Sequence, residues 1–240
     1  FSTPPPPHRL PARTRACTTH WCWACAITCA RTDSAARCWA YGLPSVPRPV
    51  NWKNVGDNYS DGMHIPVAHP GLSRLLAGTD KIEAKEWIDK MWGHVTETPS
   101  NHWPERQYQK LLGTFDHIPT ERRRLWAYYK LWPNVAFDIY PDQVDFMQFI
   151  PVSATQTMIR EIAYVQPNAN REMNAARYLN WRINRQVNAE DTVLIEGVQQ
   201  GMESSSYATG PLSPSEVCLI SFGNRMRSLI PEAKLEHAPA

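Results

Sequence analysis

The chain has 240 residues, a formal net charge of +2, 42% hydrophobic residues and 21 prolines. This length is enough for one principal domain with a well-buried core. No stretch approaches the roughly 18 uninterrupted apolar residues of a membrane-spanning helix, and the sequence does not open on a recognisable signal peptide. No basic stripe is interleaved with aromatic residues. We therefore expect neither a membrane nor nucleic acid as a partner.

The first 49 residues differ in composition from the rest of the chain. Residues 1 to 50 contain six arginines, one acidic residue (Asp33) and five of the six cysteines, which leaves only Cys218 in the body. A disulfide-built secreted fold would spread its cysteines, so the body is expected to be a reduced, cytoplasmic domain. Because residues 1–49 show no helical or strand period, we interpret them as an irregular leader, a remnant or an out-of-frame translation. Residues 231–240 are expected to form a tail.

A second interpretation of the leader is a metal-binding module. Cys17-x2-His20 and Cys22-x2-Cys25 have spacings typical of zinc ligands. The two pairs are separated by a single residue, which leaves little chain to wrap a tetrahedral site. Under this interpretation the protein is a metal-binding interaction protein that binds zinc through its leader. A chain from which the body domain had been deleted would still bind zinc.

The first part of the body predicts helices. From Asn51 a short helical pattern runs until Pro66 and the Pro70-Gly71 pair interrupt it. Residues 80 to 94 space four apolar side chains as in a peripheral amphipathic helix: Ile82, Trp87, Ile88 and Met91.

The period then shifts towards two. Segments rich in aromatic and β-branched residues predict an antiparallel meander: 125–132, 134–140, 143–150 and 157–165. Aromatic side chains on these segments either line a pocket or form core: Phe137, Tyr140, Phe146 and Phe149.

The C-terminal part predicts two helices. Residues 170 to 203 carry an apolar stripe at Val187, Leu194, Val198 and Met202. Ser213-Pro214-Ser215-Glu216 is typical of a capping box that begins a last helix. Strands in one run with helices at the ends indicate an α+β domain.

Two histidines and two aspartates form a candidate metal group. His64 and His69 would point in different directions on a continuous helix, but Pro66 breaks that regularity and can bring both rings to one point. Asp61, three residues before His64, can accept a proton from the ring nitrogen that does not bind metal. Taken alone, two histidines near helix ends and a solvated acid explain the same residues.

Asp191 is the candidate for the third ligand. It falls on the apolar stripe of the predicted helix, where an unpaired carboxylate is costly unless a cation meets it. Ferrous iron that activates dioxygen is held by two histidines and one carboxylate. The alternative is local: Asn188 as an N-cap would place Asp191 in the first turn of a helix that needs no metal.

Three segments, in this order, carry a family resemblance: NWKNVGDNYSDGMHIPVAHPGL, LWPNVAFDIYPDQVDFMQFIPV and NRQVNAEDTVLIEGVQQGM. They resemble the catalytic domain of Rieske-type aromatic-ring-hydroxylating oxygenase α subunits and of related enzymes that oxidise amines and betaines. The resemblance covers about residues 50–230. It implies a helix-grip fold of the START/Bet v 1-like type, an antiparallel sheet around a long C-terminal helix.

The resemblance also implies a function and a site. His64, His69 and Asp191 would hold a mononuclear non-haem Fe(II), and Asp61 would link the site to the cluster of a neighbouring subunit. The chain would insert oxygen from O2 into a small aromatic or amine/betaine-like substrate, by mono- or dioxygenation, with electrons from a Rieske cluster through a reductase or ferredoxin. A homotrimer is implied.

One departure concerns the [2Fe-2S] cluster expected of the family. Its site needs Cys-x-His followed by Cys-x2-His. Here Cys17-x2-His20 resembles only the second half, so we expect an incomplete ligand set and interpret the chain as truncated or altered at its N-terminus. A non-catalytic carrier of hydrophobic ligands is the rival function, since the same scaffold serves such proteins. It would have no reason to bring two histidines and an aspartate together.

Overall fold

The computed structural model describes residues 26–27, 39–42, 45–76, 81–167 and 169–234. The leader residues considered as ligands, Cys17, His20, Cys22 and Cys25, lie outside the described residues, as do 235–240 of the expected tail. Within the described ranges, no helix is both long enough and apolar enough to cross a membrane.

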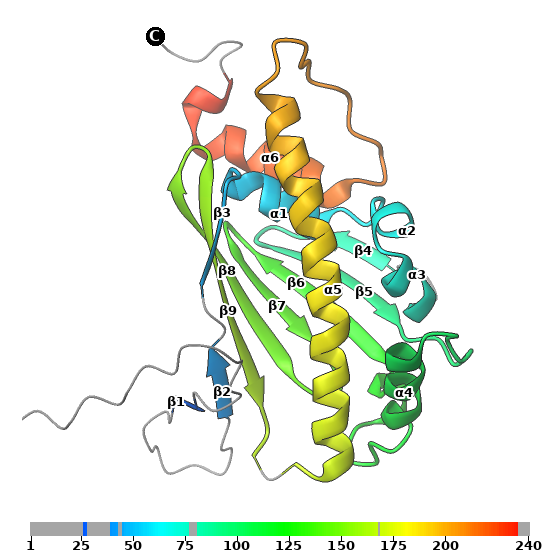
Figure 1. The fold of residues 1–240 in the computed structure, drawn as a ribbon. Coiled ribbons are helices and arrows are strands. Elements are labelled where there is room, and N and C mark those ends of the chain that lie inside the picture. The colour runs from blue at the N-terminus through cyan, green and yellow to red at the C-terminus, as the bar shows by residue number, and fades with distance from the viewer. Residues whose placement is uncertain (1–25, 28–38, 43–44, 77–80, 168, 235–240) are drawn as a thin grey trace, which may run out of the picture.

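An antiparallel sheet forms one layer of the molecule (Figure 1). Within the described residues its strands follow the order β1-β2-β9-β8-β7-β6-β5-β4, and β3 also pairs with β9. The strand bounds are β1 Ala26–Ile27, β2 Trp39–Gly42, β3 Val46–Arg48, β4 Lys81–Ala84, β5 Ile88–His94, β6 Leu125–Leu131, β7 Val135–Ile139, β8 Val144–Ser153 and β9 Gln156–Val165.

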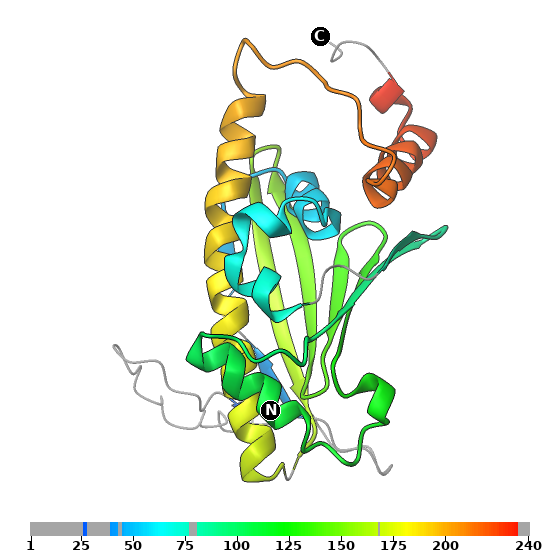
Figure 2. The same ribbon diagram turned by 90° about the vertical axis from the view of Figure 1, so that its right-hand side faces the viewer.

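Helices form the second layer. The long helix α5 runs along one face of the sheet, with shorter helices beside it (Figures 1 and 2). The α-helix bounds are α1 Trp52–Ser60, α2 Ile65–Ala68, α3 Pro70–Leu75, α4 Trp103–Leu112, α5 Arg171–Met202 and α6 Val217–Leu229. Short 3₁₀ helices span Thr120–Arg122 and Pro231–Lys234. The predicted α+β helix-grip class is therefore confirmed.

Two clusters of buried apolar side chains join the layers. The larger one packs α5 residues such as Leu179 against Tyr108 of α4 and Trp126 of β6. The smaller one joins Val55 of α1, Phe149 of β8 and Ile195 of α5. Together the two clusters pack α1, α4 and α5 against the sheet. Burial of apolar side chains in this way is the main source of fold stability.

The predicted meander is confirmed as β6 to β9, and the predicted long helix as α5. The amphipathic helix predicted for residues 80 to 94 is wrong, because β4 and β5 form a hairpin there. Ile82 and Met91 are cross-strand partners in that hairpin. Apolar residues spaced along a helix can equally meet across a tight hairpin, and the apolar spacing did not distinguish the two.

Other element predictions need correction. Residues 1 to 48 showed no strand period, yet β2 and β3 pair with β9. The last helix begins at Val217 with Glu216 as its N-cap, later than the predicted Ser213. The Glu216 carboxylate nevertheless accepts a hydrogen bond from the Ser213 backbone N–H, one half of the predicted capping box. Whether residues 1–49 are a separate leader stays a prediction.

Candidate metal centre

The two histidines stand at the ends of the shortest α-helix. His64 is the N-cap of α2, and His69 ends α2 and immediately precedes α3. Pro66 and Pro70 lie in the first turns of these helices, where a missing backbone N–H costs no hydrogen bond. The two imidazole rings meet with a centroid separation of 5.0 Å, as predicted. Pro66 does not break the chain between them, because it lies in the first turn of α2 and that helix ends only at His69.

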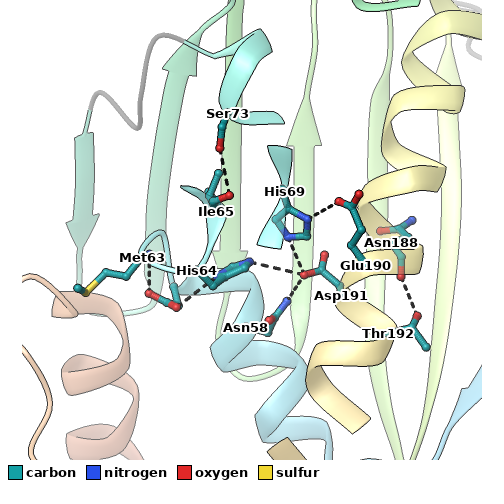
Figure 3. A network of polar contacts seen from close by, with 11 residues as sticks. Asn58, Met63, His64, Ile65, His69, Ser73, Asn188, Glu190, Asp191 and Thr192 are labelled. Carbon is teal, nitrogen blue, oxygen red and sulfur yellow. Dashed lines mark hydrogen bonds and ion pairs between the residues drawn. The ribbon is translucent and has the colours of Figure 1, made fainter. Parts of the chain in front are cut away.

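Asp191 approaches both rings from the middle of α5 (Figure 3). Its Oδ1 lies 3.0 Å from His69 Nε2 and 3.5 Å from His64 Nε2. One donor atom from each of the three residues lies within 4.8 Å of the others. α5 begins at Arg171 with Asn170 as its N-cap, so the alternative of a helix start at Asn188 is wrong.

Each histidine has a carboxylate on its other nitrogen. His64 Nδ1 lies 3.2 Å from Asp61 Oδ2, and His69 Nδ1 lies 2.8 Å from Glu190 Oε2. Metal-binding histidines commonly donate their outer N–H to a carboxylate, which fixes the ring and increases its basicity. Two Nε2 atoms and one carboxylate on a common point are the donor set of mononuclear non-haem iron, so these residues fit the metal.

The electrostatics of Asp191 favour its ionised form. Burial alone would raise its pKa, but hydrogen bonds from His64, His69 and Asn58 together hold the pKa well below the ordinary value. The Asn58 side chain of α1 donates to Asp191 Oδ1 at 2.8 Å. A carboxylate that stays ionised while largely buried is ready to bind a cation.

The Asp61 contact is present, but for a different reason from the predicted one. Asp61 is not on a helix with His64: it is the C-cap of α1, with extended backbone. Its Oδ1 accepts the Met63 backbone N–H at 2.8 Å, which folds the chain into a tight turn and leaves Oδ2 to face His64. The turn, and not helical spacing, makes the pair.

Sequence reasoning missed two neighbours of the site. Glu190 lies on the far nitrogen of His69. Asn58 of α1 donates to Asp191. The Glu190-Asp191 pair carried a usable signal, because adjacent helical residues that diverge by about 100° can reach two different atoms of one ring.

The site opens onto a cavity of about 960 Å³ between α5 and the sheet. Tyr140 and Phe149 line it and also belong to the core clusters, so both predicted alternatives apply to them, whereas Phe137 and Phe146 pack on each other with ring centroids 5.2 Å apart. Along α5 the predicted apolar stripe is only partly inward: Val198 is 46% and Met202 42% exposed, so they are not core.

Carboxylates also line this cavity on three adjacent strands. Asp138 and Asp145 are cross-strand partners, and Glu161 lies on the next strand. Burial raises the pKa of Asp138 to about 6, against hydrogen bonds from Tyr59 and Tyr140. Burial and the nearby Asp138 raise the pKa of Glu161 to about 7. Like charges directly opposite in a sheet are unfavourable, so this arrangement costs stability.

The fold and the site together define a class: a long helix held by an antiparallel sheet, with two histidines and an aspartate gathered between them. The family model for the ring hydroxylating alpha subunit (catalytic domain) matches residues 35–232. The chain belongs to this family. Its members use a mononuclear iron in this domain, and a Rieske cluster is part of the family.

Curated relatives include enzymes that oxidise amines. The chain is 26% identical over 171 residues to a chloroplastic choline monooxygenase of Atriplex hortensis, covering 68% of this chain and 34% of the relative. It is 28% identical over 167 residues to the carnitine monooxygenase oxygenase subunit of Acinetobacter baumannii, covering 66% of this chain and 40% of the relative. The chain therefore spans about a third of the length of the choline monooxygenases it matches.

Solved structures share the fold. A quaternary ammonium Rieske monooxygenase superposes with a TM-score of 0.57 at 18% identity, covering 82% of this chain and 51% of that one. Dicamba monooxygenase superposes with a TM-score of 0.52 at 12% identity, covering 79% and 58%.

Proposed function

We propose that this chain is the catalytic domain of an oxygenase component that inserts oxygen from O2 into a small organic substrate. His64, His69 and Asp191 are its iron ligands. The observation that carries the proposal is the meeting of the two Nε2 atoms with Asp191 Oδ1 beside a large cavity. When bound there, ferrous iron supplies the site at which dioxygen is activated.

The chain's own residues prepare this site in three ways. Asn58 fixes the Asp191 carboxylate, so one of its oxygens faces the histidines. Glu190 and Asp61 fix the two imidazole rings through their outer nitrogens. His69 is only 1% exposed, and its burial excludes water from that side of the centre. A centre pre-arranged in this way needs little reorganisation when a metal binds.

Asp61 is proposed to link the site to an electron donor. It touches the partly buried His64 and is itself partly exposed, so it can connect the site with the molecular surface. The structurally similar quaternary ammonium Rieske monooxygenase transfers electrons between its subunits. For this chain we propose a Rieske cluster and a reductase or ferredoxin as electron sources, and a homotrimer as the assembly.

The substrate is proposed to be a cationic amine. Asp138, Asp145 and Glu161 offer negative charge to the cavity, and the aromatic rings of Tyr59 and Tyr128 line it as well. Carboxylates attract an ammonium group directly, and aromatic faces bind it through cation–π interactions. The choline and carnitine monooxygenases among the relatives support the same substrate class.

The metal assignment is tested by anaerobic titration of the whole chain with ferrous iron. About one iron per chain is expected, with loss of binding in His64→Ala. If the unaltered chain bound no iron, the proposal would be refuted. It would favour the rival function, a carrier of hydrophobic ligands in which the cavity alone matters.

A further inference from the structure

A buried lysine of the sheet contacts α1. Lys130 of β6 is 2% exposed, and so is its cross-strand partner Asp89 of β5. The Lys130 Nζ lies 3.6 Å from Asp89 Oδ2. Removing both charges from water is costly, and a pair of well-packed apolar residues would usually serve stability as well. The pair is therefore poorly explained by stability alone.

The polar groups around this lysine are incompletely satisfied. One oxygen of Asp89 and one of Asp57 are buried without a hydrogen-bond partner. Each such oxygen carries a desolvation cost, which makes the cluster expensive to keep. The other hydrogen-bond partners of the Lys130 ammonium group indicate the role of this cluster.

Lys130 grips the second half of α1. Its Nζ donates to the Gly56 carbonyl at 3.0 Å and to Ser60 Oγ at 2.7 Å. The Ser60 hydroxyl itself donates to the Gly56 carbonyl at 3.0 Å. α1 has no basic residue in its last turn, so Lys130 supplies from the sheet the positive charge that a helix C-terminus favours.

The gripped half of α1 carries two residues of the metal centre. Asn58, between Gly56 and Ser60, donates to Asp191, and Asp61 directly follows Ser60 and contacts His64. The other end of α1 is held to α5, because Gln199 accepts from the Asn51 backbone and the Asn54 side chain. Lys130 therefore holds the second half of α1 from the sheet side, while Asn58 of the same half contacts α5.

The C-terminal helix seals this contact. The Phe222 ring of α6 lies 4.6 Å from Lys130 Nζ and packs against Trp132 and Trp52. With water excluded, the hydrogen bonds of Lys130 are stronger and more directional than at a surface.

We propose that Lys130 is a positioning residue of the iron site: by holding Gly56 and Ser60 it sets where α1 presents Asn58 to Asp191 and Asp61 to His64. The proposal rests on the proposed function, since it assumes that His64, His69 and Asp191 bind iron. It assigns a role in metal geometry to a side chain that touches neither the metal ligands nor the cavity.

The test compares the whole chain with a variant that removes both Lys130 and Asp89, so that neither member of the pair is left as an unpaired buried charge. Asp89→Leu combined with Lys130→Met keeps the volume apolar, so we expect its unfolding in urea to match or exceed that of the unaltered chain. Lys130→Met alone would strand Asp89 and is expected to unfold more easily. Lys110→Met, which removes an exposed lysine of α4, is the matched control.

Two measurements follow: anaerobic titration with ferrous iron, and the visible spectrum of the chain loaded with cobalt(II), which reports ligand geometry. We expect the stable double variant to bind iron about ten-fold more weakly and to show an altered cobalt spectrum, and Lys110→Met to behave as the unaltered chain. A stable double variant with unchanged iron affinity and an unchanged cobalt spectrum would overturn the positioning role alone. Failure of the unaltered chain to bind either metal would overturn the proposed function, and this inference with it.

Discussion

Carboxylates line the same cavity in two regions, and their surroundings shift the carboxylate pKa values in opposite directions. On α5, Asp191 is largely buried, yet donors from α1 to α3 hold its pKa well below the ordinary value. On the sheet, Asp138 is buried and Glu161 partly buried, and their pKa values rise to about 6 and about 7. Burial is common to both regions, so the difference comes from the partners.

The comparison separates two functions within one cavity. Hydrogen bonds with two histidines and an amide favour the ionised form of Asp191, the form that can bind a cation. The acids of β7, β8 and β9 repel one another when they are ionised. A cation that enters the cavity would reduce this repulsion and so favour their ionised forms. Under the proposed function, the first region would hold a resident cation and the second an exchangeable one.

The largest expected effect comes from breaking the first region. Asp191→Ala removes the carboxylate that both histidines face, so iron affinity is expected to fall more than about 100-fold, beyond the loss typical of an outer partner. Anaerobic iron titration measures it, with circular dichroism as the check on folding. Glu190→Ala, which removes only the outer partner of His69, is the comparison variant, and its affinity should fall by about 10-fold, less than in Asp191→Ala. Retention of iron in Asp191→Ala with loss in Glu190→Ala would mean that Glu190 is the ligand.

Asp61→Asn is expected to leave the iron bound and to impair turnover. The amide nearly keeps the shape of the side chain but removes the charge that faces His64 Nδ1. With an intact Rieske partner and reductase, product formation should fall by about 10-fold or more. Loss of iron would show that Asp61 is a ligand, and unchanged turnover would remove it from the mechanism.

The second region is tested by the pH dependence of cation binding. Asp138 and Glu161 are protonated below their raised pKa values and ionised above them, with Asp145 and Asp142 as further acids around them. A permanently charged probe such as choline should therefore bind about ten-fold more tightly near pH 8 than near pH 5. Calorimetry measures the affinity. The neutral isostere of choline, with carbon in place of nitrogen, should show no such rise; equal pH profiles for both would refute the cation preference.

The smallest expected effect is on stability. The pKa of Glu161 is raised in the folded state, so ionisation of this side chain destabilises the fold. The free energy of unfolding of the wild-type chain therefore falls as the pH rises from about 4.5 to about 7. Glu161→Gln avoids that loss. The variant should match the wild type near pH 4 and exceed it by about 1 kcal/mol near pH 8, a value reduced for partial exposure. Urea unfolding at both pH values measures this difference. A constant difference would contradict it.

Much of the fold was predictable because its period is regular. Alternating aromatic and β-branched residues identified β6 to β9, and the helical period identified α5. The β4-β5 hairpin was missed because its apolar residues, paired across strands, are also spaced as on a helix. β2 and β3 were missed because strands this short, of four and three residues, carry no measurable period.

The site was predictable in part. His64, His69, Asp61 and Asp191 were singled out by spacing and family resemblance, and the structure brings them together. Asn58 and Glu190 depend on the rotation of α5 against α1 and α3, which no local pattern specifies. Lys130 was invisible for the same reason: its partners lie 70 and 74 residues away along the chain.

The placement of the histidines at the two ends of α2 makes this segment sensitive to insertion and deletion. α2 has only four residues, and one residue more or less would turn one histidine by about 100° relative to the other. The loop from Glu203 to Glu216 has no such constraint, because it joins α5 to α6 over exposed chain. In lineages descended from this sequence, length changes are therefore expected to collect in that loop, while the interval from His64 to His69 keeps its residue count.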